Sequence, residues 1–191
     1  MSSIFDSRCE MSNVVFLDTE FTDFTFPELL SIGMVSKHGD EHYVELDLCS
    51  VESERAVAGS TNFVVEHVLT QWDAVPGAAS TLQVMGSSTA DYLETLVAEH
   101  GRAITIVHDY PLDYQMLKTR LVECGRWDAL SESLIPFEVS DALSRLDGAL
   151  AAEYAYARLR HRGIERHHAL ADAHALRAAY FAILTGKRVS V

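Results

Sequence analysis

The chain has 191 residues, of which 48% are hydrophobic and 23% are charged, so it is long enough for one domain with a sizeable core. Its formal net charge of −13 argues against a basic surface that follows a phosphate backbone. Any contact with nucleic acid would need bound cations as its local source of positive charge. No apolar run reaches the ~20 residues of a membrane helix, so we expect no membrane partner and predict a cytoplasmic location.

We treat residues 1–191 as a single domain, with residues 1–12 as a flexible N-terminal extension. The three cysteines, Cys9, Cys49 and Cys124, are scattered along the chain and form no CxxC pair. This spacing argues against both a disulfide framework and a zinc site.

Three strands are predicted near the start of the chain, at residues 14–20, 29–36 and 41–48. Residues 21–27 form an aromatic loop that ends at a proline, and residues 37–40 contain the Gly-Asp of a hairpin turn. Because the links are short, the three strands are expected to form an antiparallel meander.

The rest of the chain alternates between helical and strand patterns, although residues 50–87 show only a helical spacing from Phe63 to Trp72. The later predicted elements are a helix capped by Ser87 or Ser88 and ended by Gly101, a strand at 103–107, a helix from Pro111 to Gly125, a strand at 135–139, a helix at 142–160, and a last helix at 169–184 that ends at Gly186. This order predicts an α/β sandwich, in which helices cover a mixed sheet.

A pair of acids, Asp18 and Glu20, ends the first predicted strand. Alternate residues of a strand face the same side, so their Cα atoms would lie roughly 7 Å apart on one face. Two carboxylates this close repel each other unless a cation lies between them. The alternative is a strand end that frays into solvent, and the pair alone does not choose between the two.

A second acidic cluster follows the predicted strand at 103–107. If Pro111 is the first helical residue, Asp109 lies just outside the helix, where its charge suits the positive end of the helix dipole. Asp113 falls in the first turn and shares a face with Leu117 and Leu121. An acid on a face that packs against the sheet needs a partner. The pattern therefore favours Asp113 as a metal ligand and assigns Asp109 a structural role.

The third cluster lies around the start of the last predicted helix. Asp172 is one acid on an apolar stripe, and the small alanines beside it would let the helix approach the sheet closely. His167 precedes the helix and could turn toward the same site, although paired histidines near a helix start are more often surface features. His174 falls off the stripe and is expected to be exposed.

Four acids from three distant segments could thus converge: Asp18, Glu20, Asp113 and Asp172. Ligation by oxygen alone suits Mg²⁺ or Mn²⁺ rather than zinc. Two such ions can activate a water molecule and stabilise the leaving oxygen in phosphoryl transfer. A neutral histidine beside them can accept the proton of that water.

These three motifs, in this order, resemble those of the DEDDh branch of the ribonuclease H-like 3′–5′ exonucleases. Residues 16–21 match its D-x-E motif, residues 108–113 resemble its H-N-x-x-F-D motif, and residues 167–172 resemble its H-x4-D motif. The departures are Asp109 for the usual Asn, Leu112 for Phe, and His168 where Arg is frequent. That position suits solvent or a substrate phosphate, so His168 is expected to face one of the two. Residues 27–33 and the following hairpin further resemble the short bacterial exoribonucleases that include the mycobacterial poly(A)-trimming ribonuclease.

The resemblance implies a ribonuclease H-like fold with a mixed five-stranded sheet and a metal-dependent 3′–5′ exoribonuclease activity. Two Mg²⁺ (or Mn²⁺) ions would be bound by the four acids named above, and His167 would be the general base. The partner would be the 3′ end of single-stranded nucleic acid, RNA above all, and the protein would form a homodimer.

Substrate contacts are expected from four residues near the motifs, namely Thr19, Phe21, Phe24 and His108. The two phenylalanines could stack on bases, with core packing as the equal alternative. A second functional hypothesis is an exodeoxyribonuclease or oligonucleotidase with the same site. A third is a non-catalytic nucleic-acid-binding module on this fold, against which the complete set of acids argues.

Overall fold

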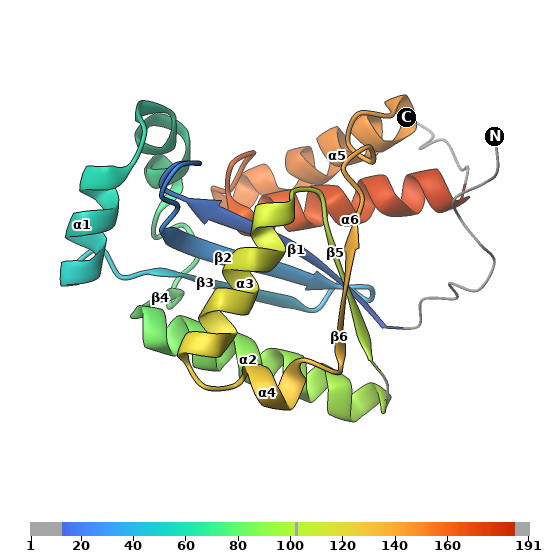
Figure 1. The fold of residues 1–191 in the computed structure, drawn as a ribbon. Coiled ribbons are helices and arrows are strands. Elements are labelled where there is room, and N and C mark those ends of the chain that lie inside the picture. Colours follow the sequence, from blue (N-terminus) through green and yellow to red (C-terminus); the bar gives the residue numbers. More distant parts are fainter. Residues whose placement is uncertain (1–12, 102, 186–191) are drawn as a thin grey trace.

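The computed structural model describes residues 13–101 and 103–185. The predicted N-terminal extension with Cys9, and Gly186 as the end of the last helix, lie outside the described residues. Within the described part, the chain forms an α/β fold around one six-stranded mixed sheet with the strand order β4-β3-β2-β1-β5-β6 (Figure 1). No described helix is both long enough and apolar enough to cross a membrane.

The first half of the sheet is the predicted antiparallel meander of β1 (Val14–Phe21), β2 (Leu29–Ser36) and β3 (Glu41–Leu46). The other half is parallel, because β5 (Ile104–His108) pairs with β1 and β6 (Leu134–Glu138) pairs with β5. The two-residue β4 (Ala79–Ser80) adds a sixth strand beside β3. Five strands were expected, and β4 lies in the stretch whose pattern was uninformative.

The helices are α1 (Val51–Gly59), α2 (Leu82–His100), α3 (Pro111–Glu123), α4 (Trp127–Leu130), α5 (Leu146–Leu159) and α6 (Ala169–Thr185). The predicted cap of α2 is wrong, because the helix begins at Leu82 and its cap is Thr81, whose side chain accepts a hydrogen bond from the Val84 N–H. Ser87 lies inside the helix and donates to the Gln83 carbonyl at 3.1 Å. Helix α1 was not predicted, and the helical spacing from Phe63 to Trp72 corresponds to a π-helical turn, Val64–Val68, followed by a 3₁₀ turn, Leu69–Gln71.

The helices form two layers on opposite faces of the sheet. Figure 1 shows α2, α3 and α4 on one face and α5 and α6 on the other. Alternate residues of β1 serve the two layers: Leu17 joins the core beneath α2 and α3, whereas Phe16 packs edge-on against Tyr180 of α6. Asp18 and Glu20 follow Phe16 in this alternation, so they face the layer that contains α6.

A close backbone contact fixes the start of α6 on the sheet. A Cβ atom added to Gly33 would lie 2.2 Å from the carbonyl carbon of Ala169, so only glycine fits at this position of β2. Gly33 is the register partner of Asp18 on the neighbouring strand. The first turn of α6 is therefore held directly beside Asp18.

Candidate metal centre

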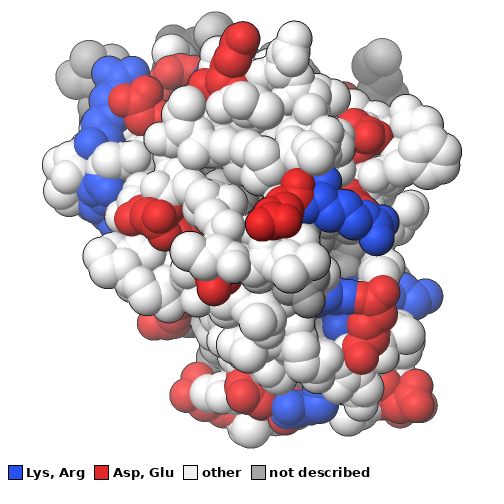
Figure 2. Space-filling view, turned by 90° about the vertical axis from the view of Figure 1, so that its left-hand side faces the viewer, with Lys and Arg blue, Asp and Glu red and all other residues white. Residues whose placement is uncertain are grey.

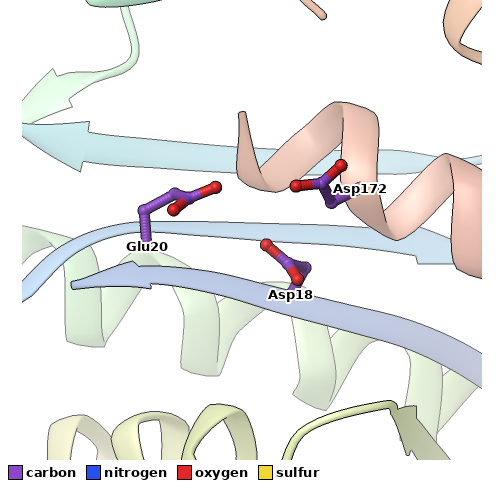
Figure 3. Close-up of side chains that lie close together, drawn as sticks. All are labelled: Asp18, Glu20 and Asp172. Atoms are coloured by element: carbon purple, nitrogen blue, oxygen red, sulfur yellow. The ribbon is translucent and has the colours of Figure 1, made fainter. Parts of the chain in front are cut away.

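Three of the predicted ligands converge between β1 and α6. Figure 3 shows the carboxylates of Asp18 and Glu20, from β1, gathered beside that of Asp172, from the first turn of α6. Ligand oxygens of the three side chains lie within 4.8 Å of one another. The pairing register of β1 shifts between Glu20 and Phe21, a bulge that ends the regular ladder directly after the second acid.

The fourth predicted ligand, Asp113, belongs to a second group of acids that shares Asp18. Asp113 is only 2% exposed, in the first turn of α3. Its Oδ1 atom accepts two hydrogen bonds from Thr19, at 2.8 Å from the hydroxyl and 3.2 Å from the backbone N–H. Its Oδ2 atom is buried without a hydrogen-bond partner. Thr19, expected to contact substrate, thus orients a carboxylate of the site.

Asp109 is the fifth acid of the cluster. Ligand oxygens of Asp109, Asp18 and Asp113 also lie within 4.8 Å of one another. Asp109 lies just outside α3, as predicted, but its carboxylate also joins this group of acids, which a structural role alone did not include. The turn between β5 and α3 brings it near Asp18 and Asp113, and the linear spacing of the motif did not reveal this.

Burial and mutual repulsion raise the pKa values of these acids. The pKa values of Asp18 and Glu20 lie well above the usual range, first because the side chains are buried and second because of neighbouring carboxylates. Burial likewise raises the pKa of Asp113 to about 7 and that of Asp172 to about 7. The pKa of Asp109 is raised for the same reason. Without cations, the cluster therefore retains protons near neutral pH.

Asp172 is held by two donors. The Tyr156 hydroxyl on α5 donates to its Oδ1 atom at 2.5 Å, and the backbone N–H of His167 donates to its Oδ2 atom at 3.0 Å. Sequence reasoning missed Tyr156, because a tyrosine in an alanine-rich helix carries no motif. These two bonds fix the carboxylate so that it faces β1.

His167 lies beside the acids at the end of the loop that precedes α6. Its backbone is in the left-handed region, with φ of 66°, which is uncommon outside glycine. Its half-buried ring packs edge-on against Phe63, with the ring centroids 4.8 Å apart. Burial lowers its pKa, and the charges of Arg166 and His67 lower it further. The imidazole is therefore neutral at pH 7 and able to accept a proton.

Two other histidines differ from expectation. His168 was expected to face solvent or a substrate phosphate, but it is 3% exposed and stacks on Tyr43 at 4.4 Å. Neither of its ring nitrogens has a hydrogen-bond partner, and burial lowers its pKa to about 4. His174 was expected to be exposed, but its side chain is 18% exposed and bonds to Glu41 at 2.8 Å.

A segment without a sequence motif covers the histidine side of the centre. The π-helical turn Val64–Val68 carries His67, whose ring centroid lies 6.0 Å from that of His167. The side-chain amide of Gln71 binds the loop before α6 at two points: it donates to the Arg166 carbonyl at 2.8 Å and accepts from the Glu165 N–H at 2.7 Å. This clamp holds the loop that carries His167.

The aromatic residues near the acids are only partly buried. Phe24 is 72% exposed and contacts the rings of Phe21 and Tyr110 edge-on, at 5.2 and 5.8 Å. This placement leaves Phe24 open to stacking and rules out core packing for it. His108, in contrast, is buried, with its Nδ1 atom 3.0 Å from the Tyr110 carbonyl oxygen.

The surface charge agrees with a local site rather than an extended basic groove. Figure 2 shows the molecule from the side of α1, where lysine and arginine side chains form a few local groups with acids beside them. Arg55, for example, is paired with Glu28, and Arg162 with Glu41. On this face the described basic residues do not form a continuous track.

The acids, their partners and the neutral histidine come from β1, the β5–α3 turn, the first turn of α3, helix α5, and α6 with the loop before it. No family model and no curated protein sequence matches this chain. The case for a function therefore comes from the residues of the site and from the resemblance of their motifs.

The donor set suits divalent cations. All five acids offer oxygen, which Mg²⁺ and Mn²⁺ prefer. The buried Oδ2 atom of Asp113 lacks a protein partner, and a cation would satisfy it. Cations would also remove the repulsion that raises the pKa values of Asp18 and Glu20.

Proposed function

We propose that the chain is a metal-dependent 3′–5′ exoribonuclease with a ribonuclease H-like fold. One observation carries this proposal: acids from three distant segments bring their oxygens within 4.8 Å in two groups that share Asp18. The three motifs that resemble those of the DEDDh exonucleases supply these acids in the expected order. The antiparallel and then parallel arrangement of the sheet is compatible with that fold.

The roles of the residues follow from their contacts. Two divalent cations at the acids would activate a water molecule and stabilise the leaving oxygen. Thr19 orients Asp113, and Tyr156 orients Asp172. His167 accepts the proton of the attacking water, because its lowered pKa keeps it neutral. The water oxygen bonds to the terminal phosphorus while the bond to the preceding 3′ oxygen breaks, which releases a nucleoside 5′-monophosphate.

The substrate proposed is single-stranded RNA. The exposed ring of Phe24 offers a stacking surface that does not depend on base identity. The net charge of −13 favours a short contact at a chain end over a long duplex footprint. The preference for RNA over DNA comes from the resemblance to the short bacterial exoribonucleases, as does the homodimer, and the cytoplasmic location comes from the sequence.

The test is degradation of a 5′-labelled single-stranded RNA in Mg²⁺ or Mn²⁺. A 3′–5′ exonuclease gives a ladder that shortens one nucleotide at a time, and a circular RNA of the same sequence stays intact. EDTA and the Asp18→Asn variant should both abolish the ladder. Cleavage that persists in EDTA, or that opens the circle, would contradict the proposal.

A matched DNA oligomer and a series of two- to five-nucleotide RNAs separate the related hypotheses. Faster cleavage of DNA would assign an exodeoxyribonuclease, and activity confined to the shortest RNAs would assign an oligonucleotidase. Binding of RNA without cleavage in either metal would favour the non-catalytic module.

A further inference from the structure

Asp109 lies outside the ligand set that the motifs imply, since relatives carry asparagine at its position. In this chain it follows β5, which ends at His108, and precedes α3, which begins at Pro111. Its carboxylate oxygen lies within 4.8 Å of ligand oxygens of Asp18 and Asp113. Asp109 also contributes repulsion that raises the pKa of Asp18 and of Asp113. The Asp109 carboxylate therefore interacts directly with the other acids of the cluster.

A second observation, independent of the clustering, points to a ligand at this position. The Asp113 carboxylate is 2% exposed, and its Oδ2 atom has no hydrogen-bond partner. A buried carboxylate oxygen without a partner is costly, and native proteins rarely retain one without a bound group. The group formed by Asp18, Glu20 and Asp172 does not include Asp113. The unsatisfied oxygen therefore calls for a cation in the other group.

We propose that Asp18, Asp109 and Asp113 bind a second divalent cation in the protein free of nucleic acid, with Asp109 as a direct ligand. The chemical use of this ion rests on the proposed function, but its binding does not. With Asp109 ionised, five carboxylates face two divalent ions, so the filled centre keeps one negative charge. An asparagine would leave a neutral centre that attracts the second ion less strongly. The protein thus holds both ions before substrate arrives.

The experiment is a titration of the nucleic-acid-free protein with Mn²⁺, followed by electron paramagnetic resonance of the unbound ion and by calorimetry. The wild-type protein should bind two ions. Asp109→Asn and Asp109→Ala should each retain one ion and lower the affinity for the other by ~10–100-fold or more. Removal of a residue that only contacts a metal ligand already lowers metal affinity by about that factor. Asp172→Asn should weaken the other ion instead, and Asp18→Asn should weaken both.

The matched control is Asp128→Asn, which removes one exposed acid on α4 and should leave both ions bound with wild-type affinity. Circular dichroism of each variant verifies that it is folded. Two ions bound with wild-type affinity by both Asp109 variants would overturn this inference, as would a single ion in the wild-type protein.

The outcomes also separate this inference from the proposed function. If the wild-type protein degrades RNA but the Asp109 variants keep both ions, the function stands and the second site as described here falls. If the wild-type protein binds two ions that depend on Asp109 but degrades no RNA, the site stands and the function falls.

Discussion

The two sides of the centre are built in different ways. On the carboxylate side, Asp18 and Glu20 are part of β1, and Asp113 and Asp172 lie in the first turns of α3 and α6. On the histidine side, His167 lies in a loop with a left-handed backbone. Its surroundings come from Phe63 and from the clamp by Gln71, almost a hundred residues earlier in the chain.

The difference shows how each side keeps its geometry. Regular hydrogen bonding of the sheet and helices holds the acids, so their positions survive small changes in neighbouring side chains. The histidine side depends on a few long-range contacts between loops. Such segments open locally at a lower free energy than strands and helices of the core. Substitutions should therefore have an all-or-none effect on the carboxylate side and a graded effect on the histidine side.

The largest effect is expected for Asp18→Asn, because Asp18 belongs to both groups of acids. Each bound ion contributes several kcal/mol to catalysis, so the loss of both lowers kcat by ~10⁴-fold or more. In EDTA the same variant should melt at a higher temperature than the wild type, because an asparagine does not have to take up a proton or bear repulsion when the site folds. Initial rates in Mn²⁺ and thermal melts in EDTA measure the two effects. An active Asp18→Asn variant would remove the carboxylate centre from the reaction.

The next effect is expected from the paired histidines. His167→Ala should lower kcat by about 10²–10⁴-fold, the usual contribution of a general base, while Mn²⁺ still binds at both positions. His168→Phe should keep the stack on Tyr43 and remove two unsatisfied nitrogens, so its kcat should stay within a few-fold of wild type and its melting temperature should not fall. Steady-state kinetics at saturating Mn²⁺ compare the two. A larger loss at His168 would reverse their roles.

A smaller effect is expected from pH on the metal-free protein. Burial raises the pKa of Asp113 and of Asp172 to about 7, so the stability that goes with their protonated forms is lost as pH rises through 7. Between pH 6.5 and 8.5 the free energy of unfolding should fall by roughly 1 kcal/mol per group, which lowers the melting temperature in EDTA by several degrees.

One partly buried and one buried histidine limit this pH window. His42 and His168 have pKa values lowered to about 4, so they oppose the trend only below their unfolded pKa near 6.5. Saturating Mg²⁺ should remove the slope above pH 6.5, because bound cations replace the protons. An equal slope in Mg²⁺ would indicate that the acids bind no ion.

The smallest effect is expected for Gln71→Ala, which removes the clamp on the loop before α6. Loss of these hydrogen bonds should destabilise the active position of His167 by about 1 kcal/mol, so kcat should fall about five-fold. The acidic limit of the pH profile of kcat should also shift. Metal binding should be unchanged, since the hydrogen bonds of Gln71 go to the loop before α6 and not to the five acids of the centre. Gln83→Ala, on the exposed face of α2, is the matched control. Wild-type kinetics in Gln71→Ala would show that the clamp has no part in positioning the base.

The elements that the sequence predicts best are those with a local physical cause. The apolar run before Asp18 forms β1, as predicted. Pro111 is the first residue of α3, a position that its fixed φ angle favours. The convergence of the four predicted acids could also be anticipated, because Asp18 and Glu20 share one face of a strand, and Asp113 and Asp172 lie on helix faces directed at the sheet. Their roles as metal ligands stay a prediction.

The features that could not be predicted depend on contacts between distant segments. Asp109 joins the cluster through the path of one turn, and Tyr156 reaches Asp172 through the packing of α5 on α6. His168 is buried because the start of α6 lies on the sheet, which the helical pattern alone does not specify. The segment around Phe63 is irregular, with a π-helical turn that interrupts the expected spacing.

The contact between Gly33 and Ala169 has a consequence for the size of ion that fits the centre. The approach of α6 to β2 is limited only by backbone atoms, so any side chain at position 33 would push the start of α6 outward and widen the gap between Asp18 and Asp172. Ca²⁺ requires oxygens at about 2.3–2.6 Å, whereas Mg²⁺ accepts them at about 2.0–2.1 Å. Direct backbone contact between a strand and a helix thus keeps the carboxylates as near to one another as the chain allows, which suits the shorter bonds of the smaller cation.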